Sequence, residues 1–471
     1  MIGPPPPGRR PGRPGQGSRR PGRVDEVSTS VMWFRRDLRL ADNPALLAAC
    51  DADEVVPLFV IDPALWKPSG RVRRRYLLDS LRALDESLGG ALVVRQGDPR
   101  TVLPKVAREV SATSVHHAAD YGPYGARRDE EVAEALGEVD VEVAVLGSPY
   151  AVAPGRITNG SGSPYKVYSA FQRAWAEHGW RQPVDAPTGV TWADLDSHRW
   201  PDAALPGDME IVAAGEKAAH RTWETFRDDG LADYDDARNI PGGEGSSRMS
   251  TYLKWGEIHP RTILADLARK RSAAAETYRK EIAWREFYAD VLFNNPDSAR
   301  QDYNKAFSAM EYDDPGEGFE AWRKGETGYP IVDAGMRQLA ATGFMHNRVR
   351  MITASFLVKD LHVWWRHGAR HFMDLLADGD VASNQHGWQW MAGSGTDAAP
   401  YFRIFNPTTQ GKKFDPDGTY VRRWVPELAD VPAKQIHEPQ DVAGYPEPIV
   451  DHKEEREESL RRYEKVKNNK S

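Results

Sequence analysis

Apolar residues in the first third of the chain form short runs that alternate with amphipathic stretches. Val72–Leu88 and Gly125–Leu136 space their apolar positions as helices do. Strands that alternate with helices predict a parallel, doubly wound α/β domain over residues 27–147. The runs that predict strands are short and rich in β-branched residues: 27–34, 54–61, 91–95, 114–118 and 141–146.

The pattern changes after residue 147. Residues 148–206 are rich in Gly, Pro, Ser and Trp and predict an inter-domain linker, with a short helix near Tyr165–His178. Helical patterns dominate residues 207–471 and strand-like runs are absent, so we expect an all-α second domain. Its last segment, Lys453–Lys467, predicts a charged surface helix. Residues 1–26 hold mostly Pro, Gly and Arg and predict a disordered basic tail.

Composition and charge limit the class of protein. Of 471 residues, 40% are hydrophobic and 28% are charged, and no apolar run is long enough for a membrane span. The single cysteine, Cys50, excludes an internal disulfide and fits a reducing compartment, so we expect a cytoplasmic protein. With 62 basic against 69 acidic side chains the net charge is −7, so binding to DNA would need a local basic face.

Several common catalytic motifs are absent from the sequence. The turn after the first predicted strand, residues 35–39, reads RRDLR and not Gly-x-Gly-x-x-Gly, so it does not support a dinucleotide site. No Walker loop, H-E-x-x-H, cysteine pair or Ser-His-Asp order occurs. Neither hydrolytic nor zinc chemistry is indicated, and no metal is expected.

A polar and aromatic stripe marks one predicted helix. Glu281, Trp284, Arg285 and Tyr288 fall at i, i+3, i+4 and i+7, on one helical face. A carboxylate, a guanidinium and two aromatic rings suit a planar polar ligand. The alternative is a helix–helix salt bridge flanked by core aromatics.

Two further segments carry polar residues at helical spacing. Asn347, Arg350 and Met351 lie three and four apart, and the Asn amide suits a base edge; a surface helix start is the alternative. Residues 245–250 form a small-residue loop that leads into a helix, which fits either an anion site or a plain N-cap.

The stretch 378–390 combines acids, an amide and tryptophans around glycines. Asp380, Asn384 and Trp388 are spaced i, i+4 and i+8 and should share a helical face. Buried polar groups need partners, and a ring system rich in N–H and C=O groups would supply them. An acid-rich metal site is the alternative, but this stretch holds only two carboxylates and no His/Cys set surrounds them; His386 alone is interpreted as a structural histidine.

Together these segments resemble the class I cyclobutane pyrimidine dimer photolyases of the photolyase/cryptochrome family, from Val31 to about Lys467. The resemblance implies an α/β antenna domain joined by a long linker to a helical FAD-binding catalytic domain, and light-dependent DNA repair. The segments that carry it are WFRRDLRLADNPAL at 33–46, WREFY at 284–288, GYPIVDAGMRQL at 328–339, MHNRVRMITASFLVKDL at 345–361 and GTDAAPYFRIFNPTTQGKKFDP at 395–416.

The resemblance also implies which residues bind FAD, which the family holds in a bent, U-shaped form. Contacts on the phosphate and adenine side fall on Tyr234, Ser246, Ser247, Arg248, Met249 and Ser250. Contacts on the flavin side fall on Glu281, Arg285, Asn347, Arg350, Asp378, Gly379, Asp380 and Asn384.

The implied substrate is damaged DNA with its pyrimidine dimer flipped out of the duplex, which costs less for a poorly stacked lesion. Excited reduced FAD gives an electron to the dimer, the cyclobutane ring splits and the electron returns. Glu281 and Asn347 are implied to stabilise the lesion's radical anion, and Asn384 to face flavin N5. The lesion is expected against Glu281, Trp284, Asn347, Arg348, Met351 and Trp390.

An electron relay for reducing oxidised FAD is implied too. Trp388 and Trp365 match the inner two of the relatives' three tryptophans, and Tyr312 stands at the outer position. We therefore expect the relay to end in Tyr312, with Asp313 or Asp314 as the acceptor of the phenolic proton. The alternative end points are Trp322 and Trp364.

The family carries a second, light-harvesting chromophore. The segment Asp120–Asp129 lacks the Asn-Glu pair of folate-binding relatives, and Lys254 is similar to the lysine of deazaflavin-type relatives. With Arg73, Asp120 and Lys254 as its contacts, the expected antenna is 8-hydroxy-5-deazaflavin; methenyltetrahydrofolate is the alternative.

Three other functions compete with dimer repair. Plant-type cryptochromes, which are blue-light photoreceptors, resemble one another in carrying Asp where this chain has Asn384, and a (6-4) photoproduct lyase would show His at Asn347. The third is a nucleotide-binding α/β protein with a helical appendage. We expect a monomer that contacts DNA phosphates through a basic group of residues: Arg348, Arg403, Lys412, Lys413, Arg422 and Arg423.

Overall fold

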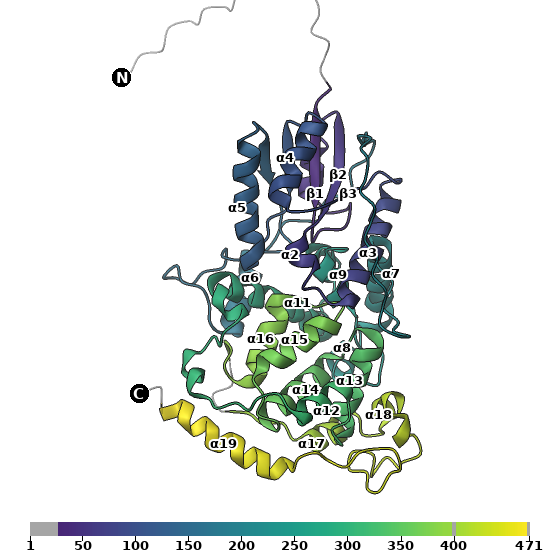
Figure 1. Ribbon diagram of the computed structural model, residues 1–471, viewed down its shortest axis with the longest axis vertical. Coiled ribbons are helices and arrows are strands. Elements are labelled where there is room, and N and C mark those ends of the chain that lie inside the picture. The colour runs from purple at the N-terminus through teal and green to yellow at the C-terminus, as the bar shows by residue number, and fades with distance from the viewer. Residues whose placement is uncertain (1–26, 398–401, 469–471) are drawn as a thin grey trace, which may run out of the picture.

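The structure, a computed structural model, describes residues 27–397 and 402–468. The predicted basic tail, residues 1–26, lies outside the described residues. Figure 1 shows two bodies of secondary structure joined end to end: an α/β body in purple and blue, and a helical body in green and yellow.

The α/β body is built on a sheet of parallel strands in the order β3-β2-β1-β4-β5. The strand order reverses beside β1, with β2 on one side and β4 on the other. A reversal of this kind leaves a crevice at the carboxyl ends of the two strands between which it occurs, here β1 and β4. The strands are β1 Thr29–Phe34, β2 Glu54–Ile61, β3 Val93–Gln96, β4 Ser114–His117 and β5 Glu142–Val145.

Helices cover both faces of the sheet, because side chains alternate along each strand. On β1, Met32 and Phe34 pack with the core under α1 and α3, whereas Val31 and Trp33 pack with the core under α4 and α5. The predicted doubly wound parallel sheet is confirmed. The helices of this body are α1 Pro44–Ala49, α2 Pro63–Trp66, α3 Arg71–Ser87, α4 Pro99–Glu109 and α5 Pro123–Gly137.

The helical body follows a long connection that contains α6, close to the short helix predicted there. Apart from isolated bridges, the described residues after 147 form no strand, as predicted. The helices are α6 Tyr168–His178, α7 Glu216–Thr225, α8 Tyr234–Ala237, α9 Met249–Trp255, α10 Pro260–Ala268, α11 Ala273–Asn294, α12 Glu317–Lys324, α13 Pro330–Thr342, α14 Asn347–Lys359, α15 Trp365–Leu375, α16 Val381–Ala392, α17 Pro407–Phe414, α18 Thr419–Trp424 and α19 His452–Asn468. Short single turns of helix lie at Phe226–Gly230, Pro296–Ala299, Lys305–Ala309 and Pro426–Leu428.

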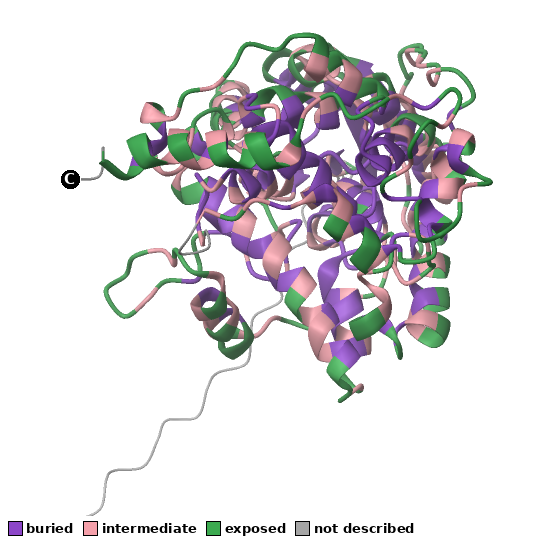
Figure 2. Ribbon diagram, turned by 90° about the horizontal axis from the view of Figure 1, so that it is seen from below, coloured by how far each residue is buried: buried purple, intermediate pink, exposed green. Residues whose placement is uncertain are grey.

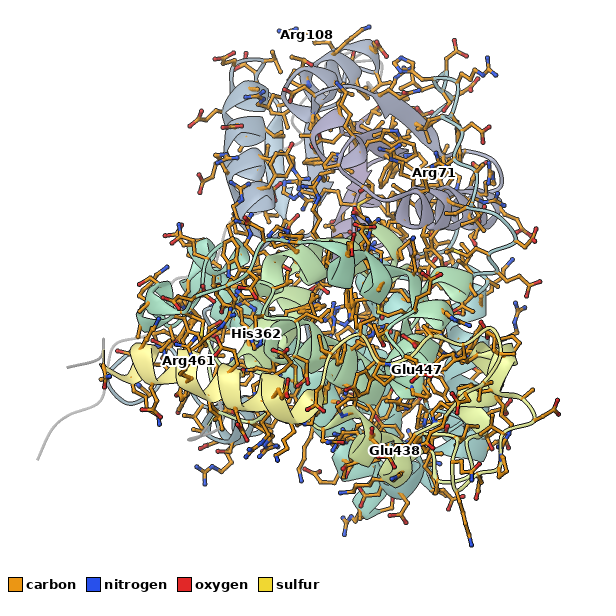
Figure 3. The ribbon with its side chains drawn as sticks, turned by 60° about the horizontal axis from the view of Figure 1, so that its bottom comes forward. Arg71, Arg108, His362, Glu438, Glu447 and Arg461 are labelled. Atoms are coloured by element: carbon orange, nitrogen blue, oxygen red, sulfur yellow. The ribbon has the colours of Figure 1, made fainter. Side chains whose placement is uncertain are left out.

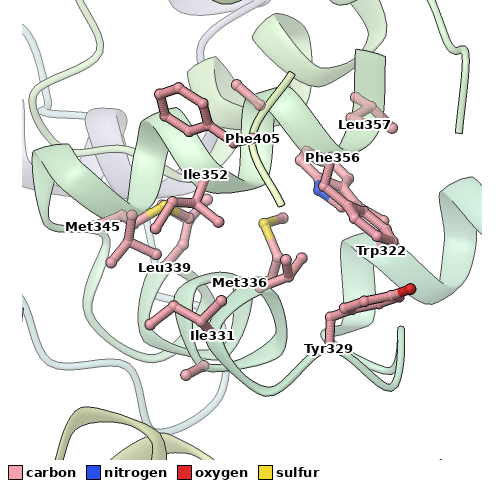
Figure 4. Packing of buried hydrophobic residues seen from close by; sticks show 14 of the residues in the cluster. Trp322, Tyr329, Ile331, Met336, Leu339, Met345, Ile352, Phe356, Leu357 and Phe405 are labelled. Carbon is pink, nitrogen blue, oxygen red and sulfur yellow. The ribbon is translucent and has the colours of Figure 1, made fainter. Parts of the chain in front are cut away.

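The core of the helical body lies around α13 and α14. Figure 4 shows Met336 and Leu339 of α13 packed beside Ile352 and Phe356 of α14, all buried. The two helices approach closely at Gly335, where an added Cβ would lie 2.4 Å from a methyl carbon of Val349. This core holds α14 and α16 against each other.

Buried charges join the two bodies. Asp42, which follows β1, forms an ion pair with Arg261 of α10 at 2.7 Å, and both side chains are buried. Arg39 donates a hydrogen bond of 2.9 Å to the Gly256 carbonyl. Because breaking a buried pair leaves an uncompensated charge, these contacts fix the α/β body on the helical body.

Helix α19 lies along the surface of the helical body. Figure 2 shows its outer side exposed, and Figure 3 shows it running past His362, whose Nε2 lies 2.7 Å from Glu455 of α19. Its charged composition agrees with the surface helix predicted there. Within the described ranges, no helix combines the length and apolar character needed to span a membrane.

Candidate functional site

Glu281 lies on α11 beside a basic residue that sequence reasoning did not select. Arg238, which ends α8, donates to Glu281 at 2.8 Å and stands 5.5 Å from the Tyr234 ring. Burial raises the pKa of Glu281, and the Arg238 guanidinium offsets part of that rise. In the sequence, the only signal that could have indicated Arg238 is its spacing of one helical turn from Tyr234.

The other members of the α11 stripe have separate partners. Trp284 stacks on Tyr168 of α6, and Tyr288 stacks on His386. Arg285 donates two hydrogen bonds of 3.0 Å to the carbonyls of Pro149 and Leu253. The ion pair and core aromatics of the structural alternative are therefore present, and Arg285 ties α11 to the linker and to α9.

Glu286 was missed by the sequence analysis although it is almost fully buried. It accepts hydrogen bonds from the Val152 amide at 3.0 Å and the Trp175 indole N–H at 2.6 Å, and also from the Ala151 amide. Burial raises the pKa of Glu286, and these donors limit the rise. Glu286 therefore holds the linker on α11. In the sequence, the only sign of its buried position is that a charged residue stands among apolar neighbours on that side of the helix.

The segment 245–250 leads into the N terminus of α9. Arg248 adopts a left-handed conformation with φ 54° as the N-cap residue, and it provides no side-chain cap. The Ser247 hydroxyl lies 2.8 Å from the Tyr278 hydroxyl, and Tyr278 packs against Tyr234. The Ser247 hydroxyl therefore lies just before the first N–H groups of α9, and Ser246, Arg248, Met249 and Ser250 belong to the same short segment.

Arg350 of α14 links this segment to the residues before α16. It pairs with Asp378 at 2.8 Å, and its guanidinium lies 5.6 Å from the Phe344 ring, while Arg248 lies 5.0 Å from the same ring. Two cations therefore flank Phe344. On the same helix, Arg348 donates a hydrogen bond of 2.6 Å from Nη2 to Asn239. Its Nη1 lies 3.9 Å from the sulfur atom of Met351.

Asp380 and Asn384 lie at the start of α16, which packs against both α11 and α14. Asp380 caps the helix by accepting from the Ser383 amide at 3.1 Å, and it pairs with Arg36 at 2.6 Å. Burial disfavours its ionised form, but the charges of Arg36, Lys254 and Arg285 hold the pKa of Asp380 well below its ordinary value. Asn384 donates to the Ala369 carbonyl at 3.0 Å.

His386 is a structural histidine, as expected. Its ring nitrogens lie 2.8 Å from the Ala382 carbonyl and 3.0 Å from the Ser298 hydroxyl, and burial lowers its pKa to about 4.

The donor set around α9, α14 and α16 fits a dinucleotide with a polar ring system. Guanidinium groups and helix N–H groups suit phosphates, hydroxyls suit the sugar and ribityl chain, and Asp378, Asp380 and Asn384 suit ring N–H and C=O groups. Arg73, whose Nη1 is buried without a hydrogen-bond partner among the described residues, borders Gly379 at 3.0 Å from where a Cβ would stand.

The aromatic residues expected to relay electrons lie in one core. Trp388 contacts Trp322 with ring centroids 6.1 Å apart, and Trp365 contacts Trp364 at 6.1 Å. Trp365 donates its indole N–H to Asp302 at 2.8 Å, a partner that the sequence analysis missed. Tyr312 packs against the same core.

The expected proton acceptors of Tyr312 are not beside its hydroxyl. That hydroxyl is buried and has no hydrogen-bond partner among the described residues. Asp313 is instead bound by both Nη atoms of Arg462, at 2.9 and 3.1 Å. Burial raises the pKa of Tyr312 well above its ordinary value, and the charge of Asp302 acts in the same direction.

A small hollow opens at the carboxyl ends of β1 and β4, where the strand order reverses. Its lining includes Asp120 and Arg36, and Lys254 lies partly buried nearby, 4.9 Å from the Trp255 ring. Burial lowers the pKa of Lys254 to about 7, and the charges of Arg36 and Arg73 act in the same direction. The hollow is lined by Arg35, Arg36, Asp37, Ala118, Ala119, Asp120 and Pro149.

The fold and this donor set define a two-domain nucleotide-cofactor protein with a parallel α/β body and a helical body. Residues 30–188 match the family described as DNA photolyase, and residues 278–465 match the FAD binding domain of DNA photolyase. The chain belongs to the DNA photolyase family. The FAD-binding domain makes FAD the cofactor of this helical body.

Three similar proteins illustrate the relationship. The deoxyribodipyrimidine photo-lyase of Streptomyces griseus is 42% identical, over 90% of this chain and 97% of its own length. A class III photolyase of Agrobacterium tumefaciens superposes with a TM-score of 0.87 at 38% identity, over 94% of this chain and 98% of that one. A Synechocystis cryptochrome superposes with a TM-score of 0.85 at 27% identity, over 93% and 100%.

Proposed function

We propose that this enzyme repairs cyclobutane pyrimidine dimers in DNA, using blue light and bound FAD. The observation that carries the proposal is that α16 packs against both α11 and α14. Asn384 and Trp390 belong to α16, Glu281 and Trp284 to α11, and Asn347 begins α14, so the proposed site residues come from α16 and the two helices that it contacts. The curated relatives are named deoxyribodipyrimidine photo-lyase, and a dimer-repairing lyase is the activity that these residues support.

When bound in reduced form, FAD would supply the photochemistry of the proposed mechanism, which is the light-driven transfer of one electron to the dimer and its return once the ring has split. Glu281 and Asn347 hold the dimer carbonyls by hydrogen bonds that strengthen as negative charge develops. Burial raises the pKa of Glu281, which favours the protonated form that can donate to a dimer carbonyl, and Arg238 fixes the position of this side chain. Trp284, Met351 and Trp390 supply apolar surface for the flipped bases.

The proposed FAD contacts follow from the donor set. Arg248 and the N terminus of α9 would face the phosphates, with Ser246, Ser247, Met249, Ser250 and Tyr234 around them. On the flavin side, Asn384 would face N5. The remaining proposed contacts are Glu281, Arg285, Asn347, Arg350, Asp378, Gly379 and Asp380.

We propose 8-hydroxy-5-deazaflavin as the antenna, held by Arg73, Asp120 and Lys254. The hollow at the strand-order reversal and the cations at and near it support an anionic, planar chromophore. The test is reconstitution: the deazaflavin should bind and transfer excitation to FAD, and Lys254→Met should weaken its binding. If methenyltetrahydrofolate binds and transfers energy while the deazaflavin does not, the assignment is wrong.

The proposed organisation is an antenna domain at 27–147, a linker at 148–206 and a catalytic domain at 207–471, acting as a monomer in the cytoplasm. The decisive experiment is a repair assay on DNA that carries one defined lesion, in light and in darkness. Dimer repair only in light supports the proposal. Light-dependent repair of a (6-4) lesion without dimer repair, or flavin photochemistry without any repair, would support the lyase or cryptochrome alternatives instead.

A further inference from the structure

A residue of the inter-domain linker covers one face of Trp284. Tyr168, the first residue of α6, lies parallel to the indole, with ring centroids 3.6 Å apart and an angle of 8° between the planes. Both side chains are only partly buried, so this stack lies at the surface of the helical body. At this separation each ring covers one face of the other and fixes its orientation.

Tyr168 is anchored from several sides. Its hydroxyl donates to the Lys280 carbonyl of α11 at 2.8 Å, and its amide N–H hydrogen-bonds to Asp397. Two residues earlier, the Lys166 carbonyl accepts a hydrogen bond of 2.6 Å from the Thr396 hydroxyl. The linker segment is thus fixed both to α11 and to the loop that follows α16, the helix of Trp390.

The stack leaves a single ring face of Trp284 for other partners. Phe287 meets the indole edge-on at 5.8 Å, and Tyr288 lies tilted at 5.4 Å, so neither ring stacks on it. Glu281 stands one turn earlier on α11, and its charge is among the causes that raise the pKa of Tyr168, after burial. Tyr168 is therefore close to both Glu281 and Trp284.

We propose that Tyr168 is a positioning residue that holds Trp284 ready to stack on the flipped pyrimidine dimer, so that the linker forms part of the lesion site. The inference rests on the proposed function, in which Trp284 contacts the dimer. An indole already fixed from behind loses little conformational freedom when a base stacks on its other face. Undamaged DNA, whose bases stay in the duplex, gains nothing from this arrangement.

The test compares Tyr168→Ala and Tyr168→Phe in the full-length, FAD-loaded enzyme. We expect Tyr168→Ala to weaken binding of a dimer-containing duplex about three- to tenfold, the range for loss of one aromatic stack, and to leave undamaged DNA unaffected. Tyr168→Phe keeps the ring and should restore nearly all of the affinity. The repair rate of the saturated complex in light should change much less than the dissociation constant.

A double-mutant cycle with Trp284→Ala separates the possible failures. If Tyr168 acts through Trp284, then Tyr168→Ala has no further effect on dimer affinity in the Trp284→Ala background. The exposed neighbour Ser169→Ala is the matched control, and unfolding temperatures verify that each variant is folded. If Trp284→Ala itself leaves dimer affinity unchanged, the proposed lesion site is wrong and the inference falls with it.

Two results would overturn the inference while sparing the proposed lesion site. One is a dimer affinity that Trp284→Ala lowers and Tyr168→Ala does not. The other is an equal loss of affinity for damaged and undamaged DNA in Tyr168→Ala, which a general disturbance of the linker would produce.

Discussion

Glu257 is a carboxylate buried at the contact between the two bodies. It accepts hydrogen bonds from the Tyr76 hydroxyl of α3 at 2.8 Å and from the Gly215 amide at 2.6 Å. Burial raises the pKa of Glu257 to about 7, and the hydrogen bonds from Ser80, Tyr76 and Gly215 limit the rise. The folded protein therefore holds a proton on Glu257 in a range of pH in which the unfolded chain has lost it.

This difference predicts a pH-dependent loss of stability. Between the unfolded pKa of 4.5 and the folded value of about 7, folding stability falls as pH rises, by about 3 kcal/mol in total. Glu257→Gln removes this loss, so the variant should unfold at a higher temperature than wild type at pH 8, while the two differ little at pH 4.5. The exposed Glu244→Gln is the control, and an advantage for Glu257→Gln that does not grow with pH contradicts the prediction.

Tyr312 allows a second prediction at this scale. In the proposed relay its oxidation must release a proton, yet no described group accepts a hydrogen bond from its buried hydroxyl. We expect a flash on the oxidised enzyme to give a tyrosyl signal that disappears in Tyr312→Phe, and we expect repair by pre-reduced FAD to be unchanged. Transient absorption is the measurement. Trp364→Phe is the matched control, and a signal lost in that variant alone would move the end of the relay to Trp364.

The sequence reveals those site residues that follow one another along a single helix. Glu281, Trp284 and Asn384 could be predicted because helical spacing and motif likeness both mark them. Arg36, Arg238 and Asp302 could not, because each meets its partner across a long stretch of chain or between elements. Such contacts depend on tertiary packing, which no local pattern specifies.

At the scale of elements, α15 and α16 approach each other where a glycine permits it. A Cβ at Gly368 would lie 2.2 Å from the Trp388 indole and 2.5 Å from a methyl carbon of Leu357. Gly368→Ala should therefore lower the free energy of unfolding by about 1–3 kcal/mol through overpacking and should displace the Trp388 ring. Thermal unfolding and tryptophan fluorescence report the two effects. Gly137→Ala, where a Cβ meets nothing within 4 Å, is the control, and an equal response of both variants would refute the argument.

The start of α16 gives another prediction, because Asp380 both caps the helix and pairs with Arg36. Asp380→Ala removes both interactions and leaves a cation without its partner, so we expect a loss of about 3 kcal/mol of stability and weaker FAD retention. Asp380→Asn keeps a capping oxygen and should recover about 1 kcal/mol of this loss. Urea titration and the flavin content of purified protein are the measurements. Equal stability of the two variants would show that the cap contributes nothing.

The elements themselves were predictable because their patterns are local. The strand predicted at 54–61 coincides with β2, and the helix predicted at Val72–Leu88 differs from α3 by one residue at each end. The strand order β3-β2-β1-β4-β5 was not predicted, since strand pairing joins segments far apart along the chain. Buried linker anchors such as Glu286 escaped notice for the same reason, although they decide where the linker lies.

Although the whole molecule has a net charge of −7, basic residues gather at its end opposite the sheet. The expected phosphate contacts on α17 and α18, Lys412, Lys413, Arg422 and Arg423, lie at this end, which is the lower end in Figure 1. Two of them already have partners in the protein: Lys412 pairs with Glu438, and Arg422 donates to the carbonyls of Ala429 and Val431. Lys413 and Arg423 lie instead over the rings of their neighbours Phe414 and Trp424.

This difference sets the expected salt dependence of DNA binding. If the four basic residues of α17 and α18 all neutralised phosphates, they would contribute about −3.6 to the slope of log K against log salt, at roughly −0.9 per contact. Because Lys412 and Arg422 have internal partners, we expect these four residues to contribute only about −2 to the slope for a dimer-containing duplex. Lys413→Ala should make the slope less negative by about 1, and Lys412→Ala should change it by much less. Lys105→Ala, on α4 of the α/β body, serves as the control and should leave the slope unchanged. Titrations of fluorescently labelled duplex between low and moderate salt measure it, and a flat dependence in the wild-type enzyme would exclude this basic group as the DNA-binding face.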